Sequence, residues 1–265
     1  MDLEIIVKEV CRVAEKAGSF ISREAARFSS DAVVSKAYHD LVSYVDTEAE
    51  KIIVEGLSGI IPGASFHTEE ETSAREDGEY TWFIDPLDGT TNFIHGVHPY
   101  SVSIALNHRE TTIIGVVFDI TAHEMYRATK GGGAWMNGKP LSVSDTSTVD
   151  KGLFATGFPV RKFHRLTEYM KCLEYFIRSS RGVRRMGSAS VDLAHVACGK
   201  YDGFFEYGLN PWDILAGALI VREAGGSATD FRGNSDSLTG EEIVASNRFI
   251  SDEVINIVKG FMITE

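Results

Sequence analysis

One stretch, residues 82–92, constrains this chain more than any other. It reads Trp-Phe-Ile-Asp-Pro-Leu-Asp-Gly-Thr-Thr-Asn, and its aromatic and β-branched run predicts a strand that stops at a proline and an Asp-Gly turn. Two carboxylates, Asp85 and Asp88, are therefore expected at the end of that strand. Because Pro86 holds Asp85 in an extended conformation, both carboxylates can converge on one point while the Leu87 carbonyl turns outward. Such a set of oxygens is typical of a site for a hard cation.

The next residues suggest a place for phosphate. Gly89, Thr90 and Thr91 offer unencumbered amides, and their N–H groups form a concavity suited to an anion if a turn or helix begins there. An ordinary turn after a strand is the alternative that a lone Asp-x-x-Asp-Gly pattern favours. Further ligands must therefore come from other parts of the chain.

Composition limits the class of protein. Of the 265 residues 43% are hydrophobic, enough for a full core in one large domain or two closely packed halves. The net charge of −12 argues against nucleic acid or an anionic membrane as a partner. The 3 cysteines lie in apolar helical patterns, and the N-terminus has early acidic charge and no long apolar run. We therefore expect a soluble cytoplasmic protein without disulfides, signal peptide or membrane helix.

Periodic patterns predict both helices and strands. A long amphipathic helix is expected from Leu3 to about Phe28, and a second helix is expected to follow with Thr47 and Glu50 as a candidate capping box, or to begin a few residues earlier. Alternating patterns predict antiparallel strands over residues 101–106, 112–119 and 124–129. The composition turns polar near residues 142–150, so we expect an N-terminal α+β half over 1–145 and a C-terminal α/β half over 146–265.

Several other acidic residues could complete a cation site, although each has a plainer interpretation. Asp46 falls in the first turn of the second helix, where it would complement the helix dipole. Glu69, Glu70 and Glu71 follow a short predicted strand, and such a run is usually a solvated surface. Asp213 opens a predicted helix and could simply cap it.

The second half contains two more informative stretches. In Gly187-Ser188-Ala189-Ser190, either serine can cap the helix that follows. An aromatic strand then ends in Glu206, shortly before Trp212-Asp213.

The stretch at residues 82–92 closely resembles the DPxDGTTN signature of the inositol monophosphatase family, magnesium-dependent and lithium-sensitive sugar phosphatases. Residues 212–226 resemble that family's second motif, WDxAxGxxxVxEAGG, and the spaced similarities extend from Lys36 to Gly226. The resemblance implies a five-layer αβαβα sandwich, an α/β (α+β) fold of the inositol monophosphatase/fructose-1,6-bisphosphatase type. It also implies a homodimer.

The resemblance implies a role for individual residues. It assigns two or three Mg²⁺ ions per site to Glu69, Asp85, the Leu87 carbonyl, Asp88 and Asp213. Aligning the family's Gly-Glu-Glu pattern through Ser65-Phe66 puts Thr68 in place of the glycine and Glu69 as the ligand, with a shift to Glu70 as the alternative. The implied catalytic residues are Glu69, Thr90, Asp46 and Lys36. The implied substrate contacts are Asp88, Gly89, Thr90, Gly187, Ser188, Ala189, Glu206 and Asp213.

The activity implied by the resemblance is hydrolysis of a phosphomonoester by metal-activated water, with inositol 1-phosphate as the expected substrate. Residues 91–93 and Glu206 favour inositol, because nucleotide-specific relatives usually read DGTKEF. One alternative is a phosphatase for 3′-phosphoadenosine 5′-phosphate or fructose 1,6-bisphosphate, with a second phosphate held by Arg181, Arg184 and Arg185. Another is a weakly active regulatory binding protein. The expected partner is a small phosphorylated cyclitol or sugar, with no nucleic acid and no membrane.

Overall fold

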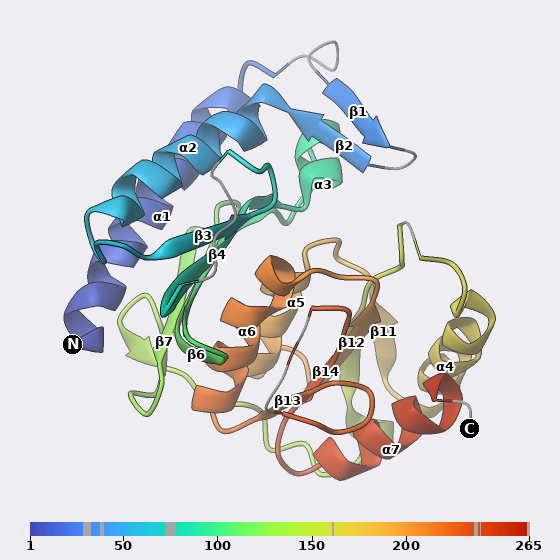
Figure 1. The fold of residues 1–265 in the computed structure, drawn as a ribbon. Coiled ribbons are helices and arrows are strands. Elements are labelled where there is room, and N and C mark those ends of the chain that lie inside the picture. The colour runs from blue at the N-terminus through green and yellow to red at the C-terminus, as the bar shows by residue number, and fades with distance from the viewer. Residues whose placement is uncertain are drawn as a thin grey trace.

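The structure is a computed structural model, and its described residues form five alternating layers of helix and sheet (Figure 1). It describes residues 1–28, 33–37, 40–72, 78–160, 162–235, 238 and 240–263, without the side chains of 33–37 and 40–42. Helices α1 (Leu3–Ala25) and α2 (Tyr44–Ser58) form the first layer. The middle layer contains α5 (Ala189–Ala197) and α6 (Pro211–Glu223), and the last contains α4 (Leu166–Ser179) and α7 (Ser251–Met262). The predicted αβαβα sandwich is confirmed.

Two sheets separate the helical layers. The larger has the order β3-β4-β5-β6-β7-β8-β9, with β3 Ser65–Thr68, β4 Tyr80–Asp88, β5 Ser101–His108, β6 Thr111–Asp119, β7 Glu124–Thr129, β8 Ala134–Met136 and β9 Lys139–Pro140. The smaller has the order β11-β10-β12-β14-β13, with β10 Leu153–Thr156, β11 Gly182–Arg184, β12 Gly203–Tyr207, β13 Ser227–Thr229 and β14 Glu242–Ser246. A hairpin of β1 (Val33–Ala37) and β2 (Asp40–Ser43), the short helix α3 (Thr90–His95) and the 3₁₀ turn η2 (Val149–Lys151) complete the described elements.

The burial of α6 explains how the layers stay together. Its sequence is apolar on every side, from Ile214 to Val221, and these residues are buried. A helix that is apolar all round must be covered on both faces, and α6 contacts strands of both sheets. The predicted boundary at residue 145 falls between β9 and η2, and this division into halves stays a prediction.

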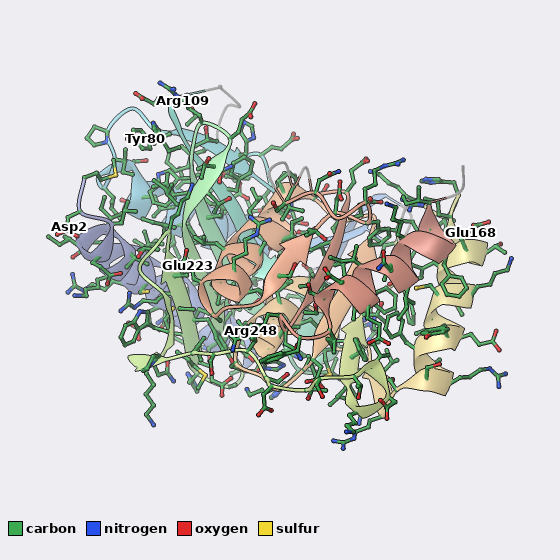
Figure 2. All side chains as sticks on the ribbon, turned by 90° about the horizontal axis from the view of Figure 1, so that it is seen from below. Asp2, Tyr80, Arg109, Glu168, Glu223 and Arg248 are labelled. Atoms are coloured by element: carbon green, nitrogen blue, oxygen red, sulfur yellow. The ribbon has the colours of Figure 1, made fainter. Side chains whose placement is uncertain are left out.

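The outer helices have one buried stripe each, as the periodicity predicts. In α1 the buried side includes Val7, Val10, Ala14 and Ile21, which pack toward the larger sheet. Asp2 at the start of α1 and Glu168 on α4 lie on opposite sides of the molecule (Figure 2). Every helix of the described residues is too short or too polar to cross a lipid bilayer.

The signature strand ends at the Asp-Gly turn, as predicted, but it does not stop at Pro86. Strand β4 continues to Asp88, and its register with β5 shifts between the pairs Asp85↔Ser103 and Asp88↔Ser101. Three steps along β4 therefore oppose two along β5, which is a β-bulge. A bulge tolerates Pro86 because the unpaired position needs no backbone N–H.

The second helix also begins earlier than the predicted Thr47–Glu50 capping box implies. Ser43 is the N-cap of α2, and Asp46 completes the capping box by accepting a hydrogen bond from the Ser43 amide at 2.9 Å. The alternative of an earlier start, with Asp46 in the first turn, is confirmed. The β1–β2 hairpin before this helix was not expected from the sequence pattern.

Candidate active site

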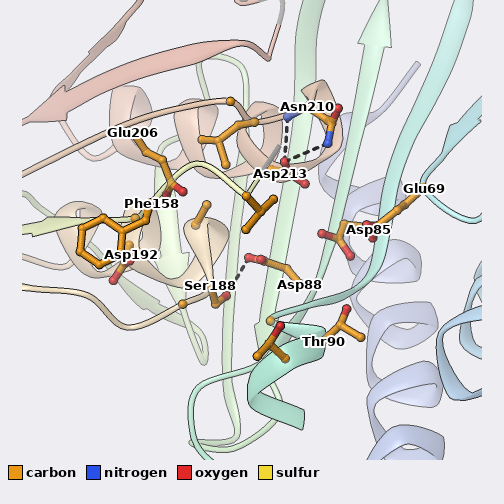
Figure 3. Close-up of a pocket in the computed structure, with 18 of the residues that line it drawn as sticks. Glu69, Asp85, Asp88, Thr90, Phe158, Ser188, Asp192, Glu206, Asn210 and Asp213 are labelled. Carbon is orange, nitrogen blue, oxygen red and sulfur yellow. Dashed lines mark hydrogen bonds between the residues drawn. The ribbon is translucent and has the colours of Figure 1, made fainter. Parts of the chain in front are cut away.

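A pocket of about 230 Å³ collects residues from both halves of the sequence (Figure 3). Among the predicted site residues, its wall includes Glu69, Asp85, Leu87, Asp88, Gly89, Thr90, Gly187, Ser188, Ala189, Glu206 and Asp213. Asp46 contacts this group through Thr90. The backbone of Lys36 belongs to β1, but its side chain lies outside the described residues.

The bulge at the end of β4 shapes one wall of the pocket. Within it the Leu87 amide donates to Asp85 Oδ1 at 2.9 Å, which fixes the Asp85 carboxyl against its own strand. The Leu87 carbonyl accepts from Thr90 Oγ1 at 3.0 Å and retains a second lone pair. Strand, bulge and the start of α3 thus present successive oxygen atoms to the same space.

Asp88 joins this strand to the middle layer. Its Oδ2 atom accepts three hydrogen bonds: from Ser188 Oγ at 2.7 Å, from Ser190 N at 2.8 Å and from Ser190 Oγ at 2.6 Å. These contacts bridge about one hundred residues of sequence and orient the carboxyl. Because Oδ2 is saturated by these donors, Oδ1 is the atom that can bind a cation.

Of the two candidate ligands Glu69 and Glu70, Glu69 is the one that lines the pocket in the described structure. Its amide donates to Ile84 O at 3.2 Å, which extends the parallel pairing of β3 with β4 by one residue. This places the Glu69 carboxyl within hydrogen-bonding reach of Asp85. The Glu70 amide instead donates to Glu50, on α2.

Asp213 reaches the same space from the first turn of α6. Its Oδ2 accepts from the amide of the N-cap residue Asn210 at 2.7 Å, which is the cap that the plainer interpretation foresaw. The carboxyl also interacts with Asp85 across the pocket. Asp213 is therefore both a helix cap and a member of the carboxylate cluster.

Burial and mutual repulsion disfavour negative charge in this cluster. Burial raises the pKa of Glu69 and of Asp85 well above the usual range, and neighbouring carboxylates add to both shifts. Burial likewise raises the pKa of Asp88, although the hydrogen bonds from Ser190 and Ser188 oppose that shift. Burial and the charge of Asp88 raise the pKa of Asp213 to about 7. Four hard oxygen ligands that repel one another fit a divalent cation such as Mg²⁺, whose charge would relieve the repulsion.

Asp46 and Thr90 form a partly buried hydrogen-bonded pair next to the cluster. Thr90 Oγ1 lies 3.1 Å from Asp46 Oδ1, while Ser43 Oγ donates to the other oxygen, Asp46 Oδ2, at 2.7 Å. Asp46 is 1% exposed, and burial raises the pKa of its carboxyl. A hydroxyl backed by a carboxylate of raised pKa can accept and pass on a proton.

The other end of the pocket contains residues suited to a polar ring. Figure 3 shows Glu206, Asp192 and Phe158 opposite Glu69 and Asp85, with Asp88 and Asp213 between the two groups. Burial raises the pKa of Glu206 well above its usual range, and the nearby Arg185 opposes this shift. Arg185 is on the pocket wall, whereas Arg181 and Arg184 are not among the described residues that line it.

Several residues of the site were missed by the sequence argument. Ser190 and Ser101 hydrogen-bond to each other at 2.8 Å beneath Asp88, and Asp192 lines the pocket although it is only 1% exposed. Glu50 was read only as a capping residue. Serines and helix-borne carboxylates have no distinctive spacing, but two acidic residues on one face of α2, Asp46 and Glu50, were a usable signal.

A second group of potential metal ligands lies away from this pocket. Asp119, Glu124 and His195 offer ligand atoms within 4.8 Å of one another. The Lys200 ammonium, however, lies 2.7 Å from Glu124 Oε2 and 3.2 Å from His195 Nε2. A cationic side chain therefore already occupies the space between these two ligands.

Comparison with known proteins identifies the family. The model of the inositol monophosphatase family matches residues 2–260 of this chain. The chain therefore belongs to the inositol monophosphatase family, and the resemblance found in the sequence is confirmed.

Relatives in this family carry two kinds of name. A putative Nus factor SuhB from Neisseria meningitidis serogroup B is 40% identical over 248 residues, which are 93% of this chain and 95% of that protein. An inositol-1-monophosphatase from Mesorhizobium japonicum is 38% identical over 255 residues, 96% of each chain. The crystal structure of the extragenic suppressor protein suhB from Bartonella henselae has a TM-score of 0.90 and 36% identity, and covers 96% of this chain and 98% of that one.

Proposed function

We propose that this chain is a Mg²⁺-dependent phosphomonoesterase that hydrolyses inositol 1-phosphate to myo-inositol and phosphate. The observation that carries the proposal is the convergence of Glu69, Asp85, Asp88 and Asp213 in one pocket, beside the Asp46–Thr90 pair. Membership of the inositol monophosphatase family supports the same class of activity.

The carboxylates divide into two overlapping sets of ligands. By family resemblance, Glu69, Asp85 and the Leu87 carbonyl would hold one Mg²⁺, while Asp85, Asp88 and Asp213 would hold another. The free Oδ1 of Asp88 and the second lone pair of the Leu87 carbonyl agree with this assignment. When bound, Mg²⁺ lowers the pKa of a water molecule and neutralises a leaving alkoxide.

The side chains of this site orient the water and receive its proton. Thr90 Oγ1 is aligned by Asp46 Oδ1 and by the Leu87 carbonyl, so its free lone pair can accept a hydrogen bond from the attacking water. Asp46, with its raised pKa, takes up the proton through Thr90. Lys36 and the amides of Gly89 and Thr90 hold the phosphate charge in this proposal.

Glu206 selects the alcohol part of the substrate. Its carboxylate accepts a hydrogen bond from a ring hydroxyl, as the resemblance implies for inositol-specific relatives. A bisphosphate is the alternative substrate class, and among the described residues of the pocket wall a second phosphate would meet the cations Arg185 and Lys162. Glu206 and Asp192 at this end offer hydrogen-bond partners to the hydroxyls of a neutral polyol, which supports inositol 1-phosphate over a bisphosphate.

A regulatory binding protein is the second candidate function. It is favoured by the relatives named as Nus factors rather than as enzymes. The net charge of −12 argues against direct contact with nucleic acid, so such a role would act through another protein.

We also propose that the chain works as a cytoplasmic homodimer, as the family resemblance implies. The three cysteines are free thiols in the structure, which agrees with a reducing compartment. Light scattering coupled to size-exclusion chromatography would give the mass of the assembly directly.

The experiment that tests the activity is phosphate release with Mg²⁺ from inositol 1-phosphate, fructose 1,6-bisphosphate and 3′-phosphoadenosine 5′-phosphate. Asp85→Asn is the key variant, because Asp85 belongs to both sets of ligands. We expect the wild type to prefer inositol 1-phosphate and the variant to lose at least 100-fold in kcat/KM, an order of magnitude typical for loss of a metal-site group. Preference for a bisphosphate would contradict inositol 1-phosphate as the substrate. Absence of Mg²⁺-dependent phosphate release would favour the regulatory function.

A further inference from the structure

Glu50 is a buried carboxylate that the proposed chemistry does not use. It lies on α2 one turn after Asp46, so the two side chains project from the same face of the helix. Asp46 contacts Thr90 on one side of the pocket. Glu50 is 0% exposed and extends instead toward the segment that follows β3.

Among the described residues, the Glu50 carboxylate accepts hydrogen bonds from Glu70 and Thr72, which follow closely after Glu69. Glu50 Oε2 accepts from the Glu70 amide at 2.7 Å. Glu50 Oε1 accepts from the Thr72 amide at 2.8 Å and from Thr72 Oγ1 at 2.6 Å. Hydrogen bonds to a buried carboxylate are about twice as strong as neutral ones, so this side chain restrains two backbone positions at once.

The backbone between these two positions needs such a restraint. Glu71 has φ of 55°, a left-handed conformation that is strained for a residue with a side chain. A left-handed residue turns the amides on either side toward one point, and here that point is the Glu50 carboxylate. Strained conformations persist where the surroundings hold them, and they are frequent at functional sites.

We propose that Glu50 is a positioning residue that holds Glu69 in place as a metal ligand. Glu69 is fixed from the strand side by the hydrogen bond that its backbone N–H donates to Ile84 O, at 3.2 Å. On the other side the chain turns away at once, and Glu50 anchors that turn at Glu70 and Thr72. One face of α2 therefore supports both the Thr90 hydroxyl and the Glu69 carboxyl.

This inference rests on the proposed metal chemistry, so its test measures metal binding as well as turnover. Glu50→Gln keeps the size of the side chain but can accept through one oxygen only. Thr72→Val keeps the Glu50 charge and removes one of the three hydrogen bonds. Glu55→Gln, an exposed position on the same helix, is the matched control for the loss of a charge.

Two readouts without substrate are decisive. In the metal-free protein, Glu50→Gln is expected to speed amide hydrogen exchange at residues 70 and 72. Titration calorimetry with Mg²⁺ alone is expected to show affinity weaker by roughly 10–100-fold, the range for groups that orient metal ligands. Thr72→Val should shift both quantities in the same direction by less, and Glu55→Gln should match the wild type.

The kinetic pattern adds a readout that a purely structural role would not move. The Mg²⁺ concentration for half-maximal rate should rise in Glu50→Gln, while kcat at saturating Mg²⁺ stays close to that of the wild type. Unchanged Mg²⁺ affinity in both variants, with a wild type that binds Mg²⁺, would overturn this inference alone. A wild-type protein that does not bind Mg²⁺ would overturn the proposed function and this inference with it.

Discussion

At the scale of single residues, the same side-chain type has different tasks in this pocket because its hydrogen bonds differ. Asp88 has one oxygen saturated by Ser188 and Ser190 and is thereby oriented. Asp192 is the opposite case, since its Oδ1 atom is buried without a hydrogen-bond partner in the described structure. Burial and the charges of Glu206 and Asp88 raise the pKa of Asp192 well above its usual range.

Because the Oδ1 atom of Asp192 is buried without a hydrogen-bond partner, we predict that Asp192→Asn stabilises the protein at alkaline pH, where the carboxyl tends to be charged. The substitution removes a buried charge, whose cost without a partner is about 1–3 kcal/mol, and each kcal/mol is worth about 2–4 °C in Tm for a chain of this size. Scanning calorimetry of the metal-free protein would measure the rise. The gain should shrink as the pH falls, because the raised pKa of Asp192 favours the protonated, uncharged carboxyl.

Asp145→Asn is the control for that substitution, because Asp145 is exposed. It should leave Tm unchanged within about 1 °C, as surface substitutions do. A drop in Tm for Asp192→Asn would mean that the carboxylate has a stabilising partner.

At the scale of elements, the site depends on the turn from β4 into α3. The β-bulge lets the strand pass through Pro86, and Gly89 then forms the N-cap of α3 with φ of 97° and ψ of 32°. This turn is crowded as well as left-handed. A Cβ atom at Gly89 would lie 3.0 Å from Pro99 O and 3.3 Å from Gly187 O.

We therefore predict that Gly89→Ala costs more stability than Gly96→Ala at the other end of the same helix. Gly96 is also left-handed, with φ of 64°, but a Cβ atom there would meet nothing within 4 Å. The backbone conformation alone costs an alanine about 1–2 kcal/mol, and only Gly89→Ala adds steric contacts. Urea denaturation would measure both variants, and equal losses would contradict the argument.

At the scale of the whole molecule, the site is complete only when the layers come together. The larger sheet and its ends contribute Glu69, Asp85 and Asp88. The middle helices contribute Asp213 and Ser188, and the smaller sheet contributes Glu206. Folding thus gathers like charges in a buried place. In a metal-free protein this repulsion opposes the burial of apolar surface that holds the layers together.

The pH dependence of stability follows from these raised pKa values. The folded protein keeps protons that the unfolded chain releases near pH 4, so metal-free stability should fall as pH rises from about 4 through the folded pKa, about 7 for Asp213. Bound Mg²⁺ replaces those protons. Excess Mg²⁺ should therefore raise Tm more at pH 8 than at pH 5.5.

Differential scanning calorimetry at the two pH values, with chelator or with Mg²⁺, would test this prediction. Replacing Mg²⁺ by an equal ionic strength of Na⁺ controls for general screening. A Tm of the chelated protein that does not change between pH 5.5 and 8, or an equal Mg²⁺ effect at both, would contradict it.

The sequence by itself determined the family, the layered fold and the residue types of the carboxylate cluster. The motifs at residues 82–92 and 212–226 revealed the family, whose layered fold the resemblance implied, while local periodicity predicted only individual helices and strands. The family resemblance assigned site roles to Asp46 and Asp213, because local signals at the start of a helix indicate only a cap or a dipole partner.

Only the tertiary structure decided how those groups are held. Strand β4 continues through Pro86 beside β5, Ser190 donates to Asp88, and Glu50 accepts from residues 70 and 72. Each of these contacts joins segments that no local sequence pattern relates. Such contacts depend on register and packing between layers, and a shift of one residue would send each side chain to the opposite face of its strand. The sequence therefore supplied the ligands, and the packing of the layers supplied their positions.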